Sequence, residues 1–267
     1  MTKEIKYSLE QIQKYWTEQA GKHGQSVSAS WSDHCVIEME IREILKYITD
    51  HDVVIDIGCA NGYTTIQLAS QKEIEIRGVD YIPEMIKQAN LRLSEIKSNL
   101  LGTVSFKCDN IAHLDESSDT YDKVIVIRVL INLHSWNYQL KGLQETIRVL
   151  KPGGLLLLSE ATLQGWQNIN KLRNEWALPD IPIPSFNCYI DRDNLVDAVS
   201  KQLKLIEIVN FSSMYYVGTR LLKPLLAQAL GKNIDVADPN MEWNRLFSQL
   251  PACGNYGIQE LFVFRKI

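Results

Sequence analysis

Three aspartates, each in or just after an apolar run, have the residue type and spacing to bind a ligand. Asp56 lies in the run 53–57, Asp80 follows 74–79, and Asp109 follows 104–108. Runs of this kind, rich in β-branched residues, indicate buried strands. Ligands of open α/β sheets bind where the strands end at their carboxyl edge. The three carboxylates are therefore expected to meet a ligand at one edge of a sheet.

Asp56 is followed by a turn that contains Gly58 and Gly62, and a helical pattern comes next. Glycine has no Cβ and tolerates positive φ, so a ligand can approach the backbone closely at such a turn. The dinucleotide fingerprint G-x-G-x-x-G fits poorly, because Ala60 and Tyr63 stand where it requires glycines. A phosphate-binding P-loop is excluded because its lysine is missing.

The turn resembles the first motif of class I S-adenosylmethionine-dependent methyltransferases, acidic-x-Gly-x-Gly-x-Gly, with Ala60 in place of the middle glycine. The string Arg-Val-Leu-Lys-Pro-Gly-Gly at 148–154, which leads into a leucine-rich strand, is also characteristic of that family. The resemblance covers residues 53–160 in the right order. It implies an α/β fold with a Rossmann-like, seven-stranded, mostly parallel sheet and helices on both faces. It also implies S-adenosylmethionine as cofactor and S-adenosylhomocysteine as product.

The resemblance assigns roles to several residues at the strand ends. Asp80 would accept hydrogen bonds from both ribose hydroxyls, and Asp109 would accept the adenine amino hydrogen. Asp109 could equally be a turn residue, and Met85 could be a core residue rather than an adenine contact. The implied cofactor site consists of Tyr15, Asp56, Gly58, Cys59, Ala60, Asn61, Gly62, Asp80, Tyr81, Met85, Asp109, Asn110, Ile111, Arg128, Val129 and Leu133.

Segments outside the nucleotide-binding core predict a lid and a cap on a single methyltransferase domain, 1–267. Two helical patterns fill residues 1–50, the first opened by the capping box at 8–11. They resemble a lid over the cofactor, although they could simply cover one face of the sheet. The core occupies 51–160. Insertions at 161–190 and at 210–258, the latter before the last strand, are expected to form a helical cap around the acceptor, or alternatively an oligomerisation arm.

Methyl transfer from a sulfonium is an in-line displacement, so alignment of the reactants carries much of the rate enhancement. A general base is useful where the acceptor must lose a proton. The candidates are Glu160 and His134, which follow strands five and four, and His34 at the start of the second helix. Each has a structural alternative as a capping or hydrogen-bonded side chain.

Aromatic residues outside the core are candidates for binding the substrate: Trp31, Tyr189, Tyr215 and Trp243. Together with Glu160 they suit a cationic acceptor through cation–π and carboxylate contacts. We therefore expect N-methylation of an amine or guanidine-like metabolite, with O-methylation of a hydroxylated metabolite as the alternative. A non-catalytic S-adenosylmethionine-binding subunit and a nicotinamide oxidoreductase are the competing functions.

Composition narrows the partners further. The 267 residues carry a net charge of −4 without a lysine or arginine run, which argues against nucleic acid. The longest apolar stretch, 154–158, is too short to cross a bilayer, and residues 1–6 lack a signal-peptide pattern. Five cysteines without metal-type spacing predict reduced thiols, no metal site and a cytoplasmic protein. The expected partner is a small-molecule substrate, and the chain is expected to be a monomer or homodimer.

Overall fold

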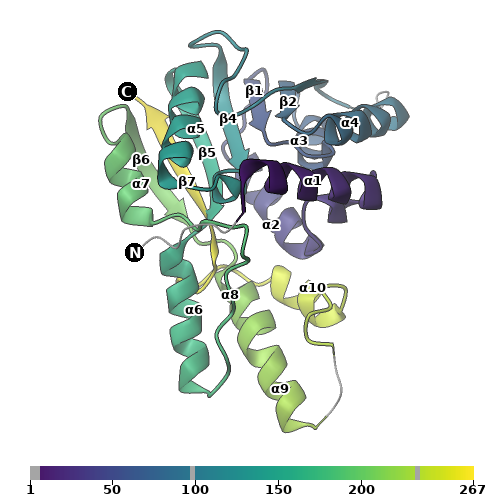
Figure 1. Cartoon of the computed structure of the whole chain (residues 1–267), viewed down its shortest axis with the longest axis vertical. Coiled ribbons are helices and arrows are strands. Elements are labelled where there is room, and N and C mark those ends of the chain that lie inside the picture. The colour runs from purple at the N-terminus through teal and green to yellow at the C-terminus, as the bar shows by residue number, and fades with distance from the viewer. Residues whose placement is uncertain (1–6, 97–99, 232–234) are drawn as a thin grey trace.

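A seven-stranded sheet forms the centre of the computed structural model, which describes residues 7–96, 100–231 and 235–267 (Figure 1). Residues 1–6 of the expected lid and 232–234 of the expected cap thus lie outside the described residues. The strand order is β3-β2-β1-β4-β5-β7-β6, and β7 alone runs antiparallel to both of its neighbours. The strands are β1 Val53–Ile57, β2 Glu75–Asp80, β3 Thr103–Cys108, β4 Tyr121–Ile127, β5 Leu150–Ala161, β6 Leu203–Val209 and β7 Gln259–Lys266.

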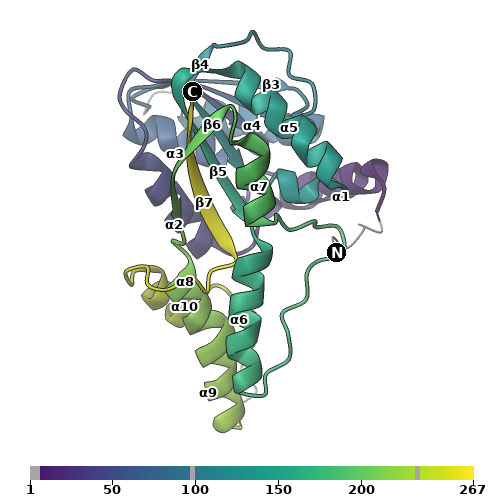
Figure 2. The ribbon, with the colours of Figure 1, turned by 90° about the vertical axis from the view of Figure 1, so that its left-hand side faces the viewer.

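Helices cover both faces of this sheet, which confirms the predicted fold class. Figure 2 shows α2 (His34–Leu45) and α3 (Tyr63–Gln71) on one side and α5 (Trp136–Val149) and α7 (Arg192–Val199) on the other. The central strands are therefore buried on both faces and read as continuous apolar runs. Their side chains form the main core, with Ile55, Val124, Ile125, Leu156 and Leu157 fully buried.

The N-terminal helix α1 (Leu9–His23) packs against α4 (Pro83–Ile96) and lies over the sheet edge at which the site forms. Its predicted capping box is present, since the Ser8 side chain accepts from the Gln11 backbone and Gln11 accepts from the Ser8 N–H. The 3-10 turn η1 (Val27–Ala29) connects it to α2. Asn61 ties this connection to the turn after β1, because its Nδ2 donates to the carbonyl oxygens of Gly24 at 3.0 Å and Ser26 at 2.7 Å.

The predicted cap before the last strand is confirmed as a helical insertion. It contains α8 (Ser213–Tyr216), a π-helical turn (Val217–Leu222), α9 (Lys223–Ala229) and α10 (Glu242–Ser248). With α6 (Leu163–Glu175) it extends away from the sheet in both ribbon views (Figures 1 and 2). Within the described residues, no helix combines the length and the apolar character needed to cross a bilayer.

A buried polar chain joins the cap to the start of α2. The Tyr215 hydroxyl donates to Asp33 Oδ1 at 2.6 Å, and Arg220 Nη2 donates to Asp33 Oδ2 at 3.1 Å. On the cap side, Asn244 Nδ2 donates to the Tyr215 oxygen and Lys223 Nζ donates to Asn244 Oδ1. Asp33, Tyr215, Asn244 and Lys223 are at most 5% exposed, so each of these groups needs the next to satisfy it, whereas Arg220 is partly exposed.

Candidate active site

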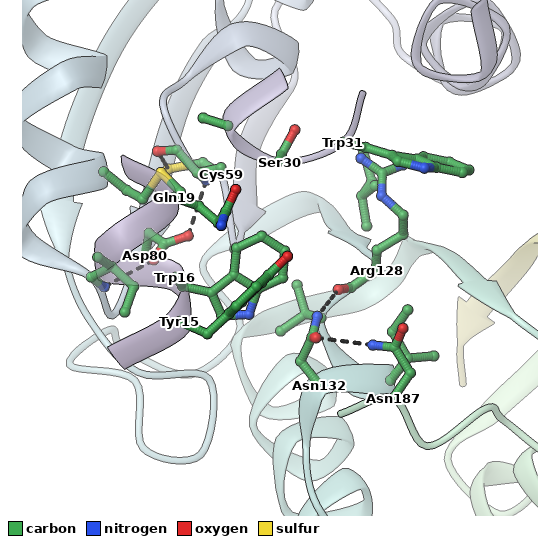
Figure 3. Close-up of a pocket in the computed structure, with 18 of the residues that line it drawn as sticks. Tyr15, Trp16, Gln19, Ser30, Trp31, Cys59, Asp80, Arg128, Asn132 and Asn187 are labelled. Carbon is green, nitrogen blue, oxygen red and sulfur yellow. Dashed lines mark hydrogen bonds between the residues drawn. The ribbon is translucent and has the colours of Figure 1, made fainter. Parts of the chain in front are cut away.

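A cavity of about 740 Å³ opens at the carboxyl ends of β1, β2 and β4 (Figure 3). Its walls come from α1, from the turns after these strands, from the segment 184–189 and from Tyr216 of the cap. This volume lies in the range of small-molecule sites, which are typically lined by aromatic side chains with a few polar groups. The cavity has two ends, one around Asp80 and one around Arg128, and each is built differently.

The turn after β1 is shaped by the acid that ends β2. Asp80 Oδ2 accepts from the Ala60 N–H at 3.0 Å, and Asp80 Oδ1 accepts from the Ile82 N–H at 2.9 Å. The backbone of Gly58 has φ 79°, and a Cβ there would lie 2.2 Å from Cγ2 of Val129. Ala60 holds the left-handed region too, with φ 48°. Glycine at 58 thus lets Val129 pack closely against the turn, and Gly58 itself lies on the cavity wall.

Two buried carboxylates give this end of the cavity its chemistry. Burial raises the pKa of Asp80 to about 6, against hydrogen bonds from backbone N–H groups that act in the opposite direction. Burial also raises the pKa of Asp56 to about 6, and the charge on Asp80 adds to the rise, whereas a hydrogen bond from Thr65 opposes it. Hydroxyl donors or a positive charge on a ligand would stabilise both carboxylates, so these residues fit a cationic nucleoside.

Most residues predicted to bind the cofactor do line this cavity. Those on its wall are Tyr15, Asp56, Gly58, Cys59, Ala60, Asn61, Asp80, Tyr81, Met85, Asn110, Ile111, Arg128, Val129 and Leu133. Gly62 is not on the wall; it is the N-cap of α3, where a Cβ would lie 2.5 Å from Cζ of Phe106. Its role is close packing of that helix against the sheet.

Asp109 is the predicted cofactor residue whose side chain the structure directs elsewhere. Its Oδ1 accepts from the Asn110 N–H at 2.8 Å and its Oδ2 from the Asp115 N–H at 3.0 Å. Lys107 Nζ lies 3.6 Å from the same carboxylate. Asp109 therefore organises its own turn, the alternative that the sequence left open, and the wall here consists of residues 110–112.

None of the three predicted general bases lines the cavity. Glu160 is fully buried, and its carboxylate accepts from the N–H groups of Val129, Leu130 and Ile131 at 2.7–3.3 Å. Burial raises its pKa to about 8, although the three N–H groups act in the opposite direction. Glu160 thus positions the loop after β4 from beneath, which corrects its expected catalytic role.

The two predicted histidines are also absent from the cavity wall, and each contacts another side chain. His34 Nε2 lies 3.3 Å from Ser28 Oγ, within hydrogen-bonding distance. The His134 ring packs on Tyr138 with 4.2 Å between centroids, and its Nδ1 is buried without a hydrogen-bond partner among the described residues. Tyr138 lines the cavity and His134 lies behind it, so His134 supports the wall rather than reaching the acceptor.

Of the predicted substrate-binding residues, Trp31 and Tyr189 line the cavity, whereas Tyr215 and Trp243 do not. Tyr215 points to Asp33 in the buried polar chain, and Trp243 Nε1 donates to the Gly218 carbonyl oxygen at 2.9 Å. The neighbour Tyr216 is on the wall instead. Successive helical residues differ in direction by about 100°, so Tyr215 lies in the core while the adjacent Tyr216 lies on the cavity wall.

At the far end of the cavity, Arg128 stacks on Trp31 and pairs with the buried Glu40. The guanidinium carbon lies 4.8 Å from the Trp31 ring centroid, and Nη1 donates to Glu40 Oε2. Glu40 also accepts from Ser159 Oγ and from Gln259 Nε2. The Arg128 side chain is only 16% exposed, so this network fixes the guanidinium at the wall.

Sequence reasoning missed Glu40, Asn132 and Asn187 as parts of the site. Asn132 Nδ2 donates to the Arg128 carbonyl oxygen at 2.6 Å, and Asn187 Nδ2 donates to Asn132 Oδ1 at 3.1 Å (Figure 3). A glutamate among the apolar positions of α2 was the one local signal for Glu40, since a buried acid requires a partner. The two asparagines carry no such signal, because their segments lie far apart in the sequence.

Comparisons with known proteins agree with this geometry. Residues 48–211, more than half of the chain, match a family described as a methyltransferase domain. An uncharacterised methyltransferase of Schizosaccharomyces pombe is 32% identical over 124 residues, covering 45% of this chain and 44% of that protein. The 27-O-demethylrifamycin SV methyltransferase of Amycolatopsis mediterranei is 28% identical over 112 residues, covering 42% and 39% respectively.

A solved structure extends the similarity in fold to almost the whole chain. The PH0226 protein of Pyrococcus horikoshii superposes with a TM-score of 0.60 at 15% identity, covering 95% of this chain and 99% of that one. At this identity the likeness concerns the fold alone. The chain spans about half or less of the length of the curated relatives that it matches.

Proposed function

Since the chain belongs to the class I S-adenosylmethionine-dependent methyltransferases, we propose that it transfers a methyl group from S-adenosylmethionine to a small-molecule acceptor in this cavity. The observation that carries the proposal is the pair of buried acids, Asp56 and Asp80, which line the cavity beside the Gly58 turn. A sulfonium nucleoside brings the positive charge and the hydroxyl donors that these acids lack. The bound cofactor supplies an activated methyl group and a neutral leaving thioether.

Each part of the cofactor has residues suited to it. Asp80 has lone pairs beyond those used by Ala60 and Ile82, and these would accept the ribose hydroxyls. Asp56 would meet the amino-acid end, and the wall at Met85 and 110–112 would hold the base. The lid would exclude water from the reacting centre, as would the aromatic group of Tyr15, Trp16 and Phe186.

The described wall favours O-methylation over the expected N-methylation. The amine expectation combined Glu160 with four aromatic residues. Trp31 and Tyr189 line the cavity, whereas Glu160, Tyr215 and Trp243 are engaged away from it, so the carboxylate that a cationic acceptor needs is missing from this end. The Arg128 end presents a guanidinium, hydroxyls and amides to an acceptor. We therefore propose a hydroxylated metabolite, and the name of the rifamycin relative is consistent with an oxygen acceptor.

Cofactor binding and turnover test the proposal separately. Calorimetry should detect S-adenosylhomocysteine binding, and Asp80→Ala should weaken it by about 100-fold or more, because two charge-assisted hydrogen bonds are lost. Glu75→Ala is the matched control, an exposed acid at the opposite end of the same strand. Undiminished affinity in Asp80→Ala would contradict the assignment. Stabilisation by NAD instead of S-adenosylhomocysteine in a thermal-shift assay would favour an oxidoreductase.

A non-catalytic cofactor-binding subunit is the second candidate. It predicts normal S-adenosylhomocysteine affinity with no release of that product from S-adenosylmethionine across a library of hydroxylated metabolites and amines.

The five cysteines are free thiols, which supports a reducing, cytoplasmic setting as part of the proposal. The exposed leucines 226, 230 and 246 of the cap keep the homodimer alternative open to a sedimentation measurement.

A further inference from the structure

The hydroxyl of Tyr216 is a polar group at the Arg128 end that the contacts among the described residues leave unused. Tyr216 is 6% exposed and lines the cavity. No hydrogen bond joins its hydroxyl to any other described residue, whereas the hydroxyl of the adjacent Tyr215 both donates and accepts. Because the Tyr216 side chain lines the cavity and its hydroxyl is not used within the protein, this hydroxyl is available to bond a ligand there.

Charged and polar groups surround Tyr216 from four segments. Arg220 lies over its ring, with 5.7 Å from the guanidinium carbon to the centroid. Arg128 and Tyr189 act on it from the cavity wall, and Asp33 from the start of α2. Both carboxylate oxygens of Asp33 are already engaged by Tyr215 and Arg220. The groups left to face an acceptor are therefore two phenols and a guanidinium.

Both phenols remain protonated and can act as donors. Burial raises the pKa of Tyr216 well above its usual value, and the nearby arginine charges only partly offset this. Burial likewise raises the pKa of Tyr189 to about 12. Neither side chain can therefore take a proton from an acceptor near neutral pH, but each can donate a hydrogen bond to a negatively charged oxygen.

The carboxylates and imidazoles on the described cavity wall lie away from the Arg128 end. They are Glu10 and His23 on α1 and the cofactor acids Asp56 and Asp80. Neither Glu10 nor His23 is among the charges that act most on Tyr216. The Arg128 end thus offers donors without a base on its wall, and the guanidinium charge is shared with Glu40 behind it. This arrangement suits an acceptor whose oxygen ionises without help from a side chain.

We propose that the acceptor binds with its reacting oxygen already ionised, as a phenolate or enolate, and that Tyr216 and Tyr189 donate hydrogen bonds to that oxygen beside Arg128. This inference rests on the proposed function and adds the acceptor class and two contacts. The acceptor proton leaves to solvent on binding. The oxygen then forms its bond to the methyl carbon while the carbon–sulfur bond breaks, and that electron pair remains on sulfur as the neutral thioether.

A chromogenic phenol tests the ionised state without turnover. With S-adenosylhomocysteine at saturation, para-nitrophenol titrated with the protein should show the phenolate spectrum below its solution pKa, with an apparent pKa lowered by about one unit or more. Tyr216→Phe, which keeps the ring over which Arg220 lies, should lose most of this shift. Tyr256→Phe, away from the cavity wall, is the matched control and should keep it. An unshifted spectrum with the unmodified protein overturns the proposal.

The pH dependence of turnover separates a bound oxyanion from a side-chain base. Across phenol, para-chlorophenol and para-nitrophenol, the midpoint of kcat/KM against pH should move with the pKa of the acceptor. A common midpoint for all three would indicate a base on the protein and overturn the proposal. Tyr216→Phe should lower kcat about tenfold to a hundredfold near neutral pH, and the deficit should shrink at high pH, where the acceptor ionises unaided.

The failures of the two proposals are distinguishable. If S-adenosylhomocysteine does not bind the unmodified protein, the proposed function fails and this inference fails with it. If the product binds and amines are methylated while phenols are neither ionised nor methylated, the methyltransferase function stands and the oxyanion inference alone is wrong. An unchanged S-adenosylhomocysteine affinity in Tyr216→Phe confirms that the substitution acts at the acceptor end.

Discussion

At the cofactor end of the cavity, the ligand site is made mostly from backbone and from residues close together in sequence, whereas the acceptor end is assembled from distant side chains. The turn 56–62, Asp80 and the segment 110–112 each lie at or just after the end of a strand. The acceptor end brings Trp31, Arg128 and Tyr216 together from the lid, the sheet and the cap. The first region depends on the parallel sheet alone, and the second depends on how the insertions pack on it.

This difference predicts different sensitivities. Strand ends are held by the hydrogen-bonding ladder and the buried core, so only changes within the turn itself should disturb the cofactor end. The acceptor end is held by the Asp33–Tyr215–Asn244 chain and by the Glu40 network. A change in the cap should therefore alter acceptor binding while cofactor binding survives. Gly58→Ala and Gly218→Ala test this separation directly, and three further substitutions test what stabilises the regions around the site.

Gly58→Ala should have the largest effect. The added Cβ would lie 2.2 Å from Val129 Cγ2 at a φ of 79°. We expect S-adenosylhomocysteine affinity to fall more than 100-fold by calorimetry, because both the turn and the loop after β4 must move. Gly153→Ala has the same φ of 79° with no atom within 4 Å, so it should show only the backbone strain of about 1–2 kcal/mol. An equal loss of S-adenosylhomocysteine affinity in the two variants would contradict the steric explanation.

Gly218→Ala should disturb the acceptor end of the cavity. A Cβ there would lie 2.1–2.5 Å from three ring atoms of Phe247, so α10 must shift. We expect roughly 1–3 kcal/mol of destabilisation in denaturant unfolding and an acceptor KM raised about tenfold, with cofactor affinity within threefold. Adding Phe247→Leu should restore part of the loss, because the smaller side chain leaves room. If the cofactor affinity fell as steeply as the acceptor affinity, the predicted separation of the two ends of the cavity would be contradicted.

Asp56→Asn should stabilise the ligand-free protein in a pH-dependent way. Burial raises the folded pKa of Asp56 to about 6, so in the unmodified protein stability falls as pH rises from about 4 to 6. The substitution removes this fall, and the gain should reach on the order of 2 kcal/mol above pH 6 and vanish near pH 4. Thermal unfolding across pH measures it, while cofactor affinity should decrease.

Asp122→Asn is the control of opposite sign for that experiment. Although Asp122 is partly buried, hydrogen bonds from Lys151 and the Val53 N–H hold its pKa below the usual value. Its contribution to stability is therefore present at neutral pH and lost as pH falls through the folded pKa. Asp122→Asn should destabilise the protein at pH 7, and the loss should shrink as pH falls below about 4. If Asp56→Asn and Asp122→Asn changed the free energy of unfolding in the same direction at pH 7, the burial explanation would be contradicted.

Gly21→Ala should give the smallest effect. Gly21 lies within α1, and a Cβ there would meet no atom within 4 Å. The lid helix should gain about 0.5–1 kcal/mol, seen as a rise of about 1–3 °C in Tm. Gly24→Ala, at φ 52° just past the end of the same helix, should lower Tm instead. A rise in both would mean that backbone conformation does not set the stability of this helix.

Much of the sheet and of the cofactor end could be predicted because the signals are local. The apolar runs, the Gly58 turn and Pro-Gly-Gly at 152–154 each depend on a few adjacent residues. Glu160 and Tyr215 could not be predicted in this way. Glu160 was assigned to catalysis because it follows a strand, but its carboxylate accepts from the loop after the neighbouring strand. Tyr215 and Tyr216 carry the same chemistry, and the direction of one short helix decides between them.

The sequence by itself therefore determined the family, the order of the elements and the backbone turn beside Asp80, because hydrophobic period and glycine placement act over a few residues. Only the tertiary structure decided which polar side chains face the cavity. Asp109, Glu160, His34 and Tyr215 all found partners elsewhere. A buried polar group takes whatever partner the packed chain brings to it, and partners from distant segments leave no pattern along the sequence.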